Sequence, residues 1–359
     1  MKENITFMDN PEKIKNNKIL IINLGGIGDM LLSTPALRAL KNKFSEAEIS
    51  MLIARRSYEI AKDLPYIDKI FIFHKRNSPI SFLRNIATLF ILRKAHFDLA
   101  INMRTLVSRR SALAIKVIMG IINPKIRVGR DTEGRGYFFN IKIPEADIGE
   151  KYEMEYDIDT VKALGAQVID RNIDFKIDRV NQEAVEIILK EEGVNRDDIV
   201  VGIHPGGEPS RQWPIENFSR VIKKIKGKID CKFVITGTGR ETKIINRLIK
   251  MSDIKLINMA GRISVKELAA LINRLHLYIA NDTGPMHIAA ALRRPLVAIF
   301  GPGCVTRFDP RNISDRAIVL YKKVDCSPCN RMFCNSRKCL TIISPEEVAA
   351  AALGLLESK

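Results

Sequence analysis

Asp29 is the first residue whose type and position suggest chemistry. It lies in LGGIGDM (24–30), a glycine-rich turn between the apolar run 18–23 and the helix-like segment 31–41. Such a turn usually holds phosphates through backbone N–H groups, and a negative charge is unfavourable there. Two interpretations stay open: Asp29 caps the following helix, or it presents a carboxylate to a substrate. The glycine spacing also departs from Gly-x-Gly-x-x-Gly, which disfavours a dinucleotide-dependent dehydrogenase.

The segment GIHPGGEPSRQWP (202–214) follows a continuous apolar run that is typical of a buried parallel strand. Gly206 and Gly207 let the backbone approach a phosphate closely, and Arg211 is suited to bidentate phosphate binding. His204, at the end of the strand, is more consistent with a satisfied structural residue than with a catalytic base.

A second strand end, ANDTGPMH (280–287), carries similar groups. Asp282 can accept hydrogen bonds from sugar hydroxyls. Thr283, Gly284 and Met286 offer backbone N–H groups to an anion, with Pro285 predicted in the first helical position. The alternative is a simple capped helix, with Asp282 as its capping residue.

A third strand end carries Glu241, in VITGTGRE (234–241). Its carboxylate can accept two ribose hydroxyls side by side, or it is an acid in the first turn of a helix. Each of these strand ends offers glycine, hydroxyl, carboxylate or cationic groups, and all lie in the second half of the chain. Together they favour a nucleotide diphosphate site.

Four of the six cysteines lie close together near the C-terminus: Cys326, Cys329, Cys334 and Cys339. This Cys-x2-Cys-x4-Cys-x4-Cys spacing could hold a structural zinc or form two disulfides. In a reducing cytoplasm the disulfides are disfavoured. A zinc site and a loop of reduced cysteines stay open as the two interpretations.

The charge is strongly positive, with 58 Lys and Arg against 41 Asp and Glu. Between Lys75 and Arg130 there are twelve basic residues and a single acid, Asp98. This excess is either a solvated basic face or a surface for an anionic partner. Nucleic acid is not expected as a partner, because no RNA- or DNA-binding motif is visible and aromatic residues are not interleaved with the cations. Residues 1–17 form a polar leader without a secretory apolar core, which favours the cytoplasm.

The elements that must position these residues form two α/β series. Strand-like runs alternate with helix-like ones, first from 18 to 129 and again from 199 to 301, with a weaker charged stretch near 149–179 between them. This alternation predicts two parallel sheets, each covered on both faces by helices. Ligands of such sheets bind outside the carboxyl ends of the strands. The chain therefore reads as two similar halves joined near 170–185, with a cleft between them.

These motifs resemble, in order and spacing, a known family. LGGIGDMLLSTPALRALK, GIHPGGEPSRQWPIENF, NMAGRISVKELAALI and ANDTGPMHIAAALRRPLVAIFGP are similar to the heptosyltransferases of lipopolysaccharide core assembly, which form glycosyltransferase family 9. The resemblance implies two Rossmann-like domains facing across a cleft, the GT-B architecture. The expected division is a leader at 1–17, an acceptor-binding domain at 18–178 and a domain at 179–359 that binds ADP-heptose and carries the cysteine cluster.

The resemblance also implies roles for the residues above. Asp29 matches the catalytic base, which takes the proton from an acceptor hydroxyl as its oxygen attacks the anomeric carbon and inverts it. Arg211 stands where the family often has a Lys that contacts the donor diphosphate. The other implied donor-binding residues are Gly206, Gly207, Glu241, Asp282, Thr283 and Gly284. No metal is required for this chemistry.

The implied acceptor is a phosphorylated lipid A-core at the inner membrane. Arg104, Arg109 and Arg110 follow a predicted strand and are the expected acceptor contacts. The segment 79–94 is apolar with flanking cations, so it either lies peripherally on the membrane or covers the sheet as a buried helix. Three alternatives are a transferase of another nucleotide sugar, a nucleotide-sugar epimerase, and a non-catalytic nucleotide-sugar- or glycolipid-binding protein. No second carboxylate–histidine set supports the epimerase.

Overall fold

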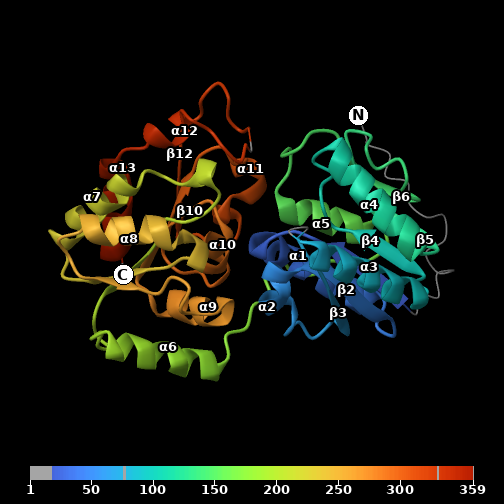
Figure 1. The fold of residues 1–359 in the computed structure, drawn as a ribbon, viewed down its shortest axis with the longest axis horizontal. Helices are drawn as coiled ribbons and strands as arrows, with labels where there is room; N and C mark the ends of the chain where they lie inside the picture. Colours follow the sequence, from blue (N-terminus) through green and yellow to red (C-terminus); the bar gives the residue numbers. More distant parts are fainter. Residues whose placement is uncertain (1–17, 76–77, 330, 359) are drawn as a thin grey trace. The chain divides into compact units, whose positions relative to one another are not determined.

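The computed structural model describes residues 18–75, 78–329 and 331–358, so the expected leader at 1–17 lies outside the described residues. The chain divides into two compact units, Met1–Asp174 and Phe175–Lys359, which we call unit 1 and unit 2 (Figure 1). Each is described by itself below.

Unit 1 is built on a parallel sheet of six strands in the order β3-β2-β1-β4-β5-β6. The strands are β1 (Lys18–Asn23), β2 (Glu48–Ala54), β3 (Lys69–Phe73), β4 (Leu99–Asn102), β5 (Ile126–Thr132) and β6 (Ile141–Glu145). The helices are α1 (Ile27–Lys43), α2 (Tyr58–Ala61), α3 (Pro79–Lys94), α4 (Arg109–Ile122) and α5 (Glu153–Lys162), with the 3-10 turn η2 (Arg55–Ser57). The direction of strand order reverses between β1 and β4, which makes their carboxyl ends the expected ligand position.

Unit 2 repeats this order as β12-β11-β10-β7-β8-β9. Its strands are β7 (Val200–His204), β8 (Lys232–Ile235), β9 (Leu256–Asn258), β10 (Leu277–Asn281), β11 (Leu296–Phe300) and β12 (Ala317–Tyr321). Its helices are α6 (Arg179–Glu191), α7 (Ile215–Lys226), α8 (Thr242–Met251), α9 (Val265–Arg274), α10 (Gly284–Ala291), α11 (Val305–Phe308), α12 (Lys338–Thr341) and α13 (Pro345–Glu357), with the turns η3 (Pro209–Arg211), η4 (Gly239–Glu241) and η5 (Pro310–Asn312). Here the order reverses between β7 and β10.

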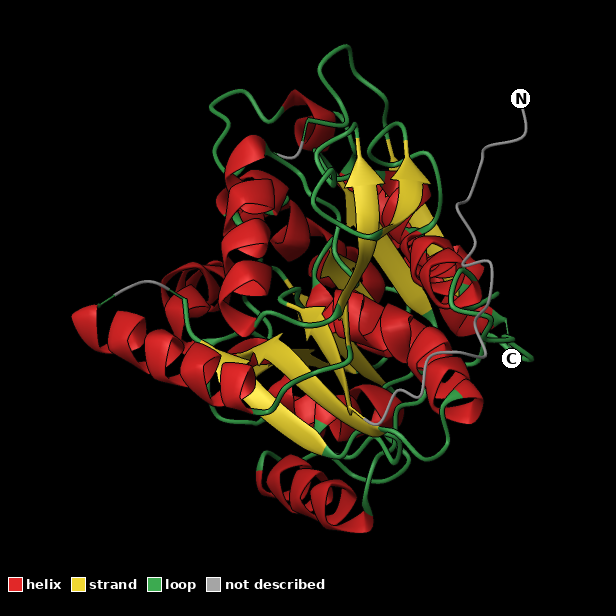
Figure 2. Cartoon of the chain, turned by 90° about the vertical axis from the view of Figure 1, so that its right-hand side faces the viewer, coloured by secondary structure: helices red, strands yellow, loops and turns green. Residues whose placement is uncertain are grey.

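The helices of each unit form two packed groups. In unit 1, α1 packs with α5 and α2, while α3 packs with α4; in unit 2, α7 packs with α8 and α13, while α9 packs with α6 and α10. In Figure 2 the strands lie between helices. The predicted α/β class, with two Rossmann-like sheets, is confirmed.

The strands that the sequence analysis missed lie at sheet edges. β6 and β12 are outermost in their sheets. Buried and half-buried residues alternate along β6, whereas β12 buries only its first residue. β6 also contains Pro144, which an edge strand tolerates because it has an unpaired side. The weak stretch near 149–179 contains the ten-residue helix α5.

The helix that carries Asp29 begins earlier than the sequence suggests. The sequence analysis places the helix-like segment at 31–41, after the glycine-rich turn. In the structure α1 begins at Ile27 and Pro35 lies inside it. Proline has no N–H to donate to the carbonyl four residues back, and the Thr34 hydroxyl donates to that carbonyl, Leu31 O, at 2.8 Å. The side chain thereby replaces the missing backbone bond, and α1 stays continuous.

This replacement predicts the effect of Thr34→Val on stability. The change leaves Leu31 O without a partner, and it also removes the acceptor of the Asp174 N–H, which bonds Thr34 Oγ1 at 3.0 Å. We expect a loss of about 2 kcal/mol in the free energy of unfolding, measured by urea denaturation. The control is Thr160→Val: Thr160 is equally buried, but the carbonyl that its hydroxyl contacts, Tyr156 O at 2.7 Å, keeps its helical N–H partner. An equal loss in both variants would contradict the explanation.

Candidate active site

Asp29 is the third residue of α1, directly after the switch-point strand β1. Its Oδ2 accepts a hydrogen bond from Gly26 N at 2.6 Å, which closes the helix N-terminus. Its Oδ1 forms an ion pair with Arg104 Nη1. The capping interpretation therefore holds for one carboxylate oxygen, while the other faces a cation. The carboxylate is 15% exposed.

Arg104 follows β4, the strand that neighbours β1 at the switch point. The sequence analysis placed it among acceptor contacts, and the structure places it on Asp29. Its Nη1 also reaches Glu153 Oε1 at 3.1 Å. Arg109 and Arg110, the other predicted acceptor contacts, are exposed at the first two positions of α4. Cations are unfavourable at a helix N-terminus, so helix stability does not explain these two.

Behind Arg104 lies a buried group of charged residues that the sequence analysis missed. Arg130, at 0% exposure, donates from Nη1 to Glu153 Oε1 at 2.9 Å and pairs through Nη2 with Asp157. Glu153 and Asp157 are four residues apart on α5, so they share a helix face. That acidic spacing was the available sequence signal, but the cationic partner lies on another element.

The same buried group includes Thr132, the last residue of β5, and Glu145, the last residue of β6. Thr105 Oγ1 accepts from Arg130 Nη1 at 3.0 Å and donates to Glu145 Oε1 at 2.8 Å. Thr132 donates to the other Glu145 oxygen at 2.5 Å. Counting Asp29, the group holds four carboxylates and two guanidiniums. This excess of acid favours a proton on one of the buried carboxyls.

Asp157 is the carboxyl that best holds this proton. Burial raises the pKa of Asp157 to about 6, against the opposing charge of Arg130. Its Oδ2 lies 2.6 Å from Ser33 Oγ, which also lies 2.8 Å from Asp29 O and accepts from Asn23 Nδ2 at 2.9 Å. One hydroxyl proton cannot serve both oxygens. Below this pKa a protonated Asp157 can donate to Ser33 and leave the serine proton for Asp29 O, whereas above it Ser33 donates to one of the two oxygens.

In unit 2, the predicted phosphate loops follow β7 and β10, which are neighbours at the switch point. Gly207 has φ +123°, and a Cβ there would lie 2.7 Å from Thr283 Cγ2. A Cβ on Gly206 would overlap the Glu241 carboxylate. The structure thus brings Gly206, Gly207, Glu241 and Thr283 together, and only glycine fits this close approach.

Arg211 and Asp282 join the same two loops. Arg211 Nη1 donates to Asp282 Oδ2 at 2.8 Å, and Asp282 is 2% exposed. The α10 N-cap is Thr283 rather than Asp282, so the alternative of Asp282 as the capping residue is wrong. Arg211, which was predicted to contact the donor diphosphate, therefore holds Asp282.

The start of α10 differs from the prediction in detail. Gly284 is its first residue and Pro285 its second. The Met286 N–H donates to Thr283 O at 3.2 Å, so it is not available to an anion, and that part of the prediction is wrong. Thr283 Oγ1 bonds Asn281 O at 3.1 Å.

Glu241 connects two loops through its carboxylate. Oε1 accepts from Gly207 N at 2.6 Å, and Oε2 accepts from Thr238 N at 2.7 Å and Thr238 Oγ1 at 3.0 Å. It is the capping-box acid of η4, as the helix-acid interpretation expects. A contact with ribose stays a prediction.

Asn281 is a positioning residue that the sequence analysis missed. Its Nδ2 donates to Pro205 O at 2.9 Å and Gly206 O at 3.0 Å, and its Oδ1 accepts from Trp213 N at 3.2 Å. The interpretation of His204 as a satisfied residue is confirmed: it is buried, shares a hydrogen bond of 3.1 Å with Thr236 Oγ1, and burial lowers its pKa.

The four clustered cysteines are free thiols, from exposed Cys326 to buried Cys339. Cys334 Sγ accepts from Arg337 N at 3.4 Å. The donor set suits zinc chemically. Among residues 18–75, 78–329 and 331–358, however, no three His, Cys, Asp or Glu side chains are arranged to hold a metal ion.

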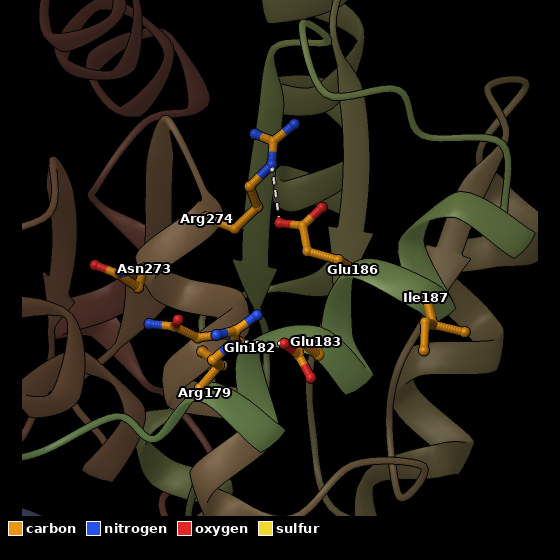
Figure 3. A pocket seen from close by; sticks show the side chains of 8 residues that line it. Arg179, Gln182, Glu183, Glu186, Ile187, Asn273 and Arg274 are labelled. Atoms are coloured by element: carbon orange, nitrogen blue, oxygen red, sulfur yellow. Dashed lines mark hydrogen bonds and ion pairs between the residues drawn. The ribbon is translucent and has the colours of Figure 1, made fainter.

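A pocket of about 760 Å³ lies between α6 and α9 of unit 2 (Figure 3). Its charged residues pair with one another, Arg274 with Glu186 at 3.5 Å and Arg179 with Glu183 at 2.6 Å. α9 ends at Arg274, just before β10 begins, so this part of the pocket is at the amino end of the strand. None of the predicted site residues lines it.

Two Rossmann-like units in one chain, each with polar groups at its switch point, match the GT-B fold. The sequence model of glycosyltransferase family 9 (heptosyltransferase) matches residues 90–340. Because this match covers more than half of the chain, the protein belongs to glycosyltransferase family 9.

Individual relatives match over nearly the whole chain. Lipooligosaccharide heptosyltransferase 2 of Campylobacter jejuni is 27% identical over 342 residues, 92% of this chain and 96% of that protein. Among solved structures, a family 9 glycosyltransferase of Veillonella parvula has a TM-score of 0.76 at 23% identity, covering 96% of this chain and 98% of that one. The E. coli ADP-heptose lipopolysaccharide heptosyltransferase II has a TM-score of 0.72 at 20% identity, covering 94% and 98%. At these identities the structural likeness shows the fold.

The raised pKa of Asp157 predicts how stability changes with pH. Because the folded state binds this proton more tightly than the unfolded chain, its contribution is complete below about pH 4 and is lost as pH rises through about 6. The contribution is about 3 kcal/mol. In Asp157→Asn, which stays neutral, thermal unfolding should depend less on pH between about pH 4 and 7. Asp159→Asn is the control, because Asp159 lies on the same helix but its carboxylate is partly exposed, beside Lys151. An unchanged slope in Asp157→Asn would contradict a protonated Asp157.

Proposed function

We propose that this protein transfers a heptose from ADP-heptose to an inner-core lipopolysaccharide acceptor, with inversion at the anomeric carbon. The observation that carries the proposal is the family match together with a carboxylate, Asp29, at the switch point of unit 1. The named relatives support heptose as the sugar.

In this proposal the domain at 18–178 binds the acceptor and the domain at 179–359 binds the donor. Asp29 accepts the proton of the attacking hydroxyl through a carboxylate oxygen.

The donor contacts are Gly206, Gly207, Arg211, Glu241, Asp282, Thr283 and Gly284. As the bond to the sugar breaks, negative charge develops on the leaving ADP. The Arg211 guanidinium and the backbone N–H groups at the start of α10 stabilise that charge. Asp282 holds the guanidinium in place through the 2.8 Å contact. These groups supply the positive charge that a metal ion would otherwise provide.

The acceptor carries phosphates, and Arg104, Arg109 and Arg110 are its proposed contacts. Both ion pairs of Arg104 use Nη1. The guanidinium has further N–H donors in a planar arrangement that suits phosphate oxygens. Arg109 and Arg110 are exposed, and an anion there would relieve the unfavourable interaction of two cations with the helix dipole.

The face of unit 1 formed by α3 and α4 is the proposed site of peripheral contact with the inner membrane. No helix in the described residues is long and apolar enough to cross a membrane. α3 buries only Asn85, Leu89 and Leu92, so the alternative of a buried sheet-covering helix is only partly right. Exposed apolar side chains of this face and its border are Ile80, Phe82, Leu83, Phe90, Ile91, Val107, Leu113, Val117 and Tyr137.

The two helices of this face carry cations and no acids. α3 and α4 contain no Asp or Glu, and their exposed cations are Arg84, Arg93, Lys94, Arg109, Arg110 and Lys116. Arg93 donates to Ile121 O at 2.8 Å and so connects the two helices. Apolar bulk with flanking cations is the composition that binds anionic lipid surfaces.

A structural zinc at Cys326, Cys329, Cys334 and Cys339 is proposed only as a support for the C-terminal loop. The spacing and the thiol donors favour it, whereas the arrangement in the described residues does not assemble a site. The metal content of the purified protein distinguishes zinc from reduced thiols.

Loss of the base predicts loss of transfer. With ADP-heptose and a heptose-deficient core glycolipid, wild type should release ADP only when the acceptor is present. Asp29→Asn should lower kcat by about 10²–10⁴-fold, because the attacking hydroxyl keeps its proton. Arg211→Gln should lower it by about 10²-fold, because the leaving diphosphate loses a cation. Asp253→Asn, in an exposed ion pair with Lys223, is the control.

The alternative functions give different results in the same assay. Turnover with another nucleotide sugar but not with ADP-heptose would identify a related transferase. Donor binding without turnover, equal in wild type and Asp29→Asn, would identify a non-catalytic binding protein.

The α3–α4 face predicts binding to anionic vesicles. Leu83→Ser/Phe90→Ser should weaken co-sedimentation with vesicles of phosphatidylcholine and phosphatidylglycerol by about tenfold, because two exposed apolar side chains are lost. The matched control is Ile169→Ser/Val180→Ser, which changes two apolar residues that are 89% and 75% exposed elsewhere. Equal weakening in both variants, or equal binding to neutral vesicles, would argue against this surface.

A further inference from the structure

Glu153 is a buried residue whose connection to Asp29 runs through another side chain. It is the first residue of α5 and has 0% exposure. Its Oε1 accepts from Arg104 Nη1 at 3.1 Å and from Arg130 Nη1 at 2.9 Å. Arg104 Nη1 in turn contacts Asp29 Oδ1. One carboxylate oxygen thus joins the partly exposed guanidinium of Arg104 to the buried guanidinium of Arg130.

We propose that Glu153 is a positioning residue of the transfer reaction: it holds the Arg104 guanidinium against Asp29 and so fixes the orientation of the Asp29 carboxylate. This inference rests on the proposed function, in which Asp29 is the base. Glu153 itself touches no substrate.

Arg104 needs such an anchor. Its side chain is long, is 22% exposed and comes from the segment between β4 and α4. An arginine side chain carries about 2 kcal/mol of rotamer entropy, which a surface ion pair alone recovers poorly. A second contact to a buried carboxylate restricts the guanidinium to one position.

The anchor itself is rigid because its own partners are buried. Arg130 is fully enclosed, lies 4.9 Å from the centre of the Tyr156 ring and also pairs with Asp157. Asp157 contacts Ser33, one turn after Asp29 on α1. The same buried group therefore reaches Asp29 from two sides, through Arg104 to the carboxylate and through Ser33 to the backbone oxygen.

Charge balance allows Glu153 to be removed without leaving excess positive charge in the interior. Without it, the group keeps Asp29, Glu145 and Asp157 against Arg104 and Arg130. Glu153→Ala should therefore fold, which thermal unfolding checks. Glu153→Gln keeps a carbonyl acceptor of the same shape and serves as the conservative variant.

The test compares kcat and KM for Glu153→Ala, Arg104→Gln and the double variant. Glu153→Ala should lower kcat roughly 10- to 100-fold, because a small misplacement of a catalytic group has about this effect. KM should stay within about twofold, and Glu153→Gln should recover part of kcat. Because Glu153 acts through Arg104, the double variant should be no slower than Arg104→Gln alone.

The control is Glu155→Gln, on the same helix, where a partly exposed carboxylate pairs with Arg171. It should keep the wild-type kcat. Losses that multiply in the double variant would overturn the inference, as would an unchanged kcat in Glu153→Ala. If Glu153→Ala does not fold, Glu153→Gln replaces it in the same comparison. Its loss of kcat should be smaller, and it should add nothing to the loss of kcat in Arg104→Gln.

Failure of the proposed function gives a different result. If wild type transfers no sugar, that function is wrong, and crystal structures of wild type, Glu153→Ala and Glu155→Gln still test the positioning. Arg104 should leave Asp29 only in Glu153→Ala. An Arg104 that stays on Asp29 in that variant would overturn the inference by itself.

Discussion

The ion pair between Arg104 and Asp29 is the interaction on which the candidate site of unit 1 depends. An isolated pair of this exposure would be weak, because water competes for both partners and the arginine is flexible. Here the guanidinium is shared with Glu153, whose other partner, Arg130, is wholly buried. The orientation of a partly exposed carboxylate is thereby set from the interior. Burying several charges is unfavourable in itself, so the arrangement favours specificity of geometry over stability.

Unit 2 also fixes the orientation of its candidate site groups, but with fewer charged side chains. Asn281 binds two backbone carbonyls and one backbone N–H, and Glu241 receives N–H groups from two loops. These contacts are with the backbone, and Glu241 Oε2 in addition accepts from the Thr238 hydroxyl at 3.0 Å. The difference follows from what each unit has to present in the proposed reaction. Phosphate binding uses backbone N–H groups, whose directions the loop conformation sets, whereas general-base catalysis uses a side chain, which needs its own support.

The sequence was sufficient for the sheets and for the residues that stand at strand ends. Buried parallel strands are continuous apolar runs, and glycine, threonine and aspartate after them mark the loops. The edge strand β6 was missed because Lys142, Pro144 and Glu145 interrupt its apolar residues, and β12 lies beyond the last strand of the predicted alternation. The partners of Arg104 were missed for another reason. Glu153 is 49 residues away, and nothing local in the sequence shows which acid a given arginine will meet.

The arginines of unit 1 act on the proposed acceptor at two distances. Exposed cations such as Arg109 and Arg110 act over about 10 Å at moderate salt and attract any anion. A phosphorylated acceptor drawn to this face brings its own negative charge close to the carboxylate of Asp29. Of the predicted acceptor contacts, Arg104 is paired with Asp29 and therefore acts at contact distance. It can neutralise the carboxylate during approach, and its remaining donors can take a phosphate oxygen as the hydroxyl reaches Asp29. Long-range attraction and local orientation are thus assigned to different arginines.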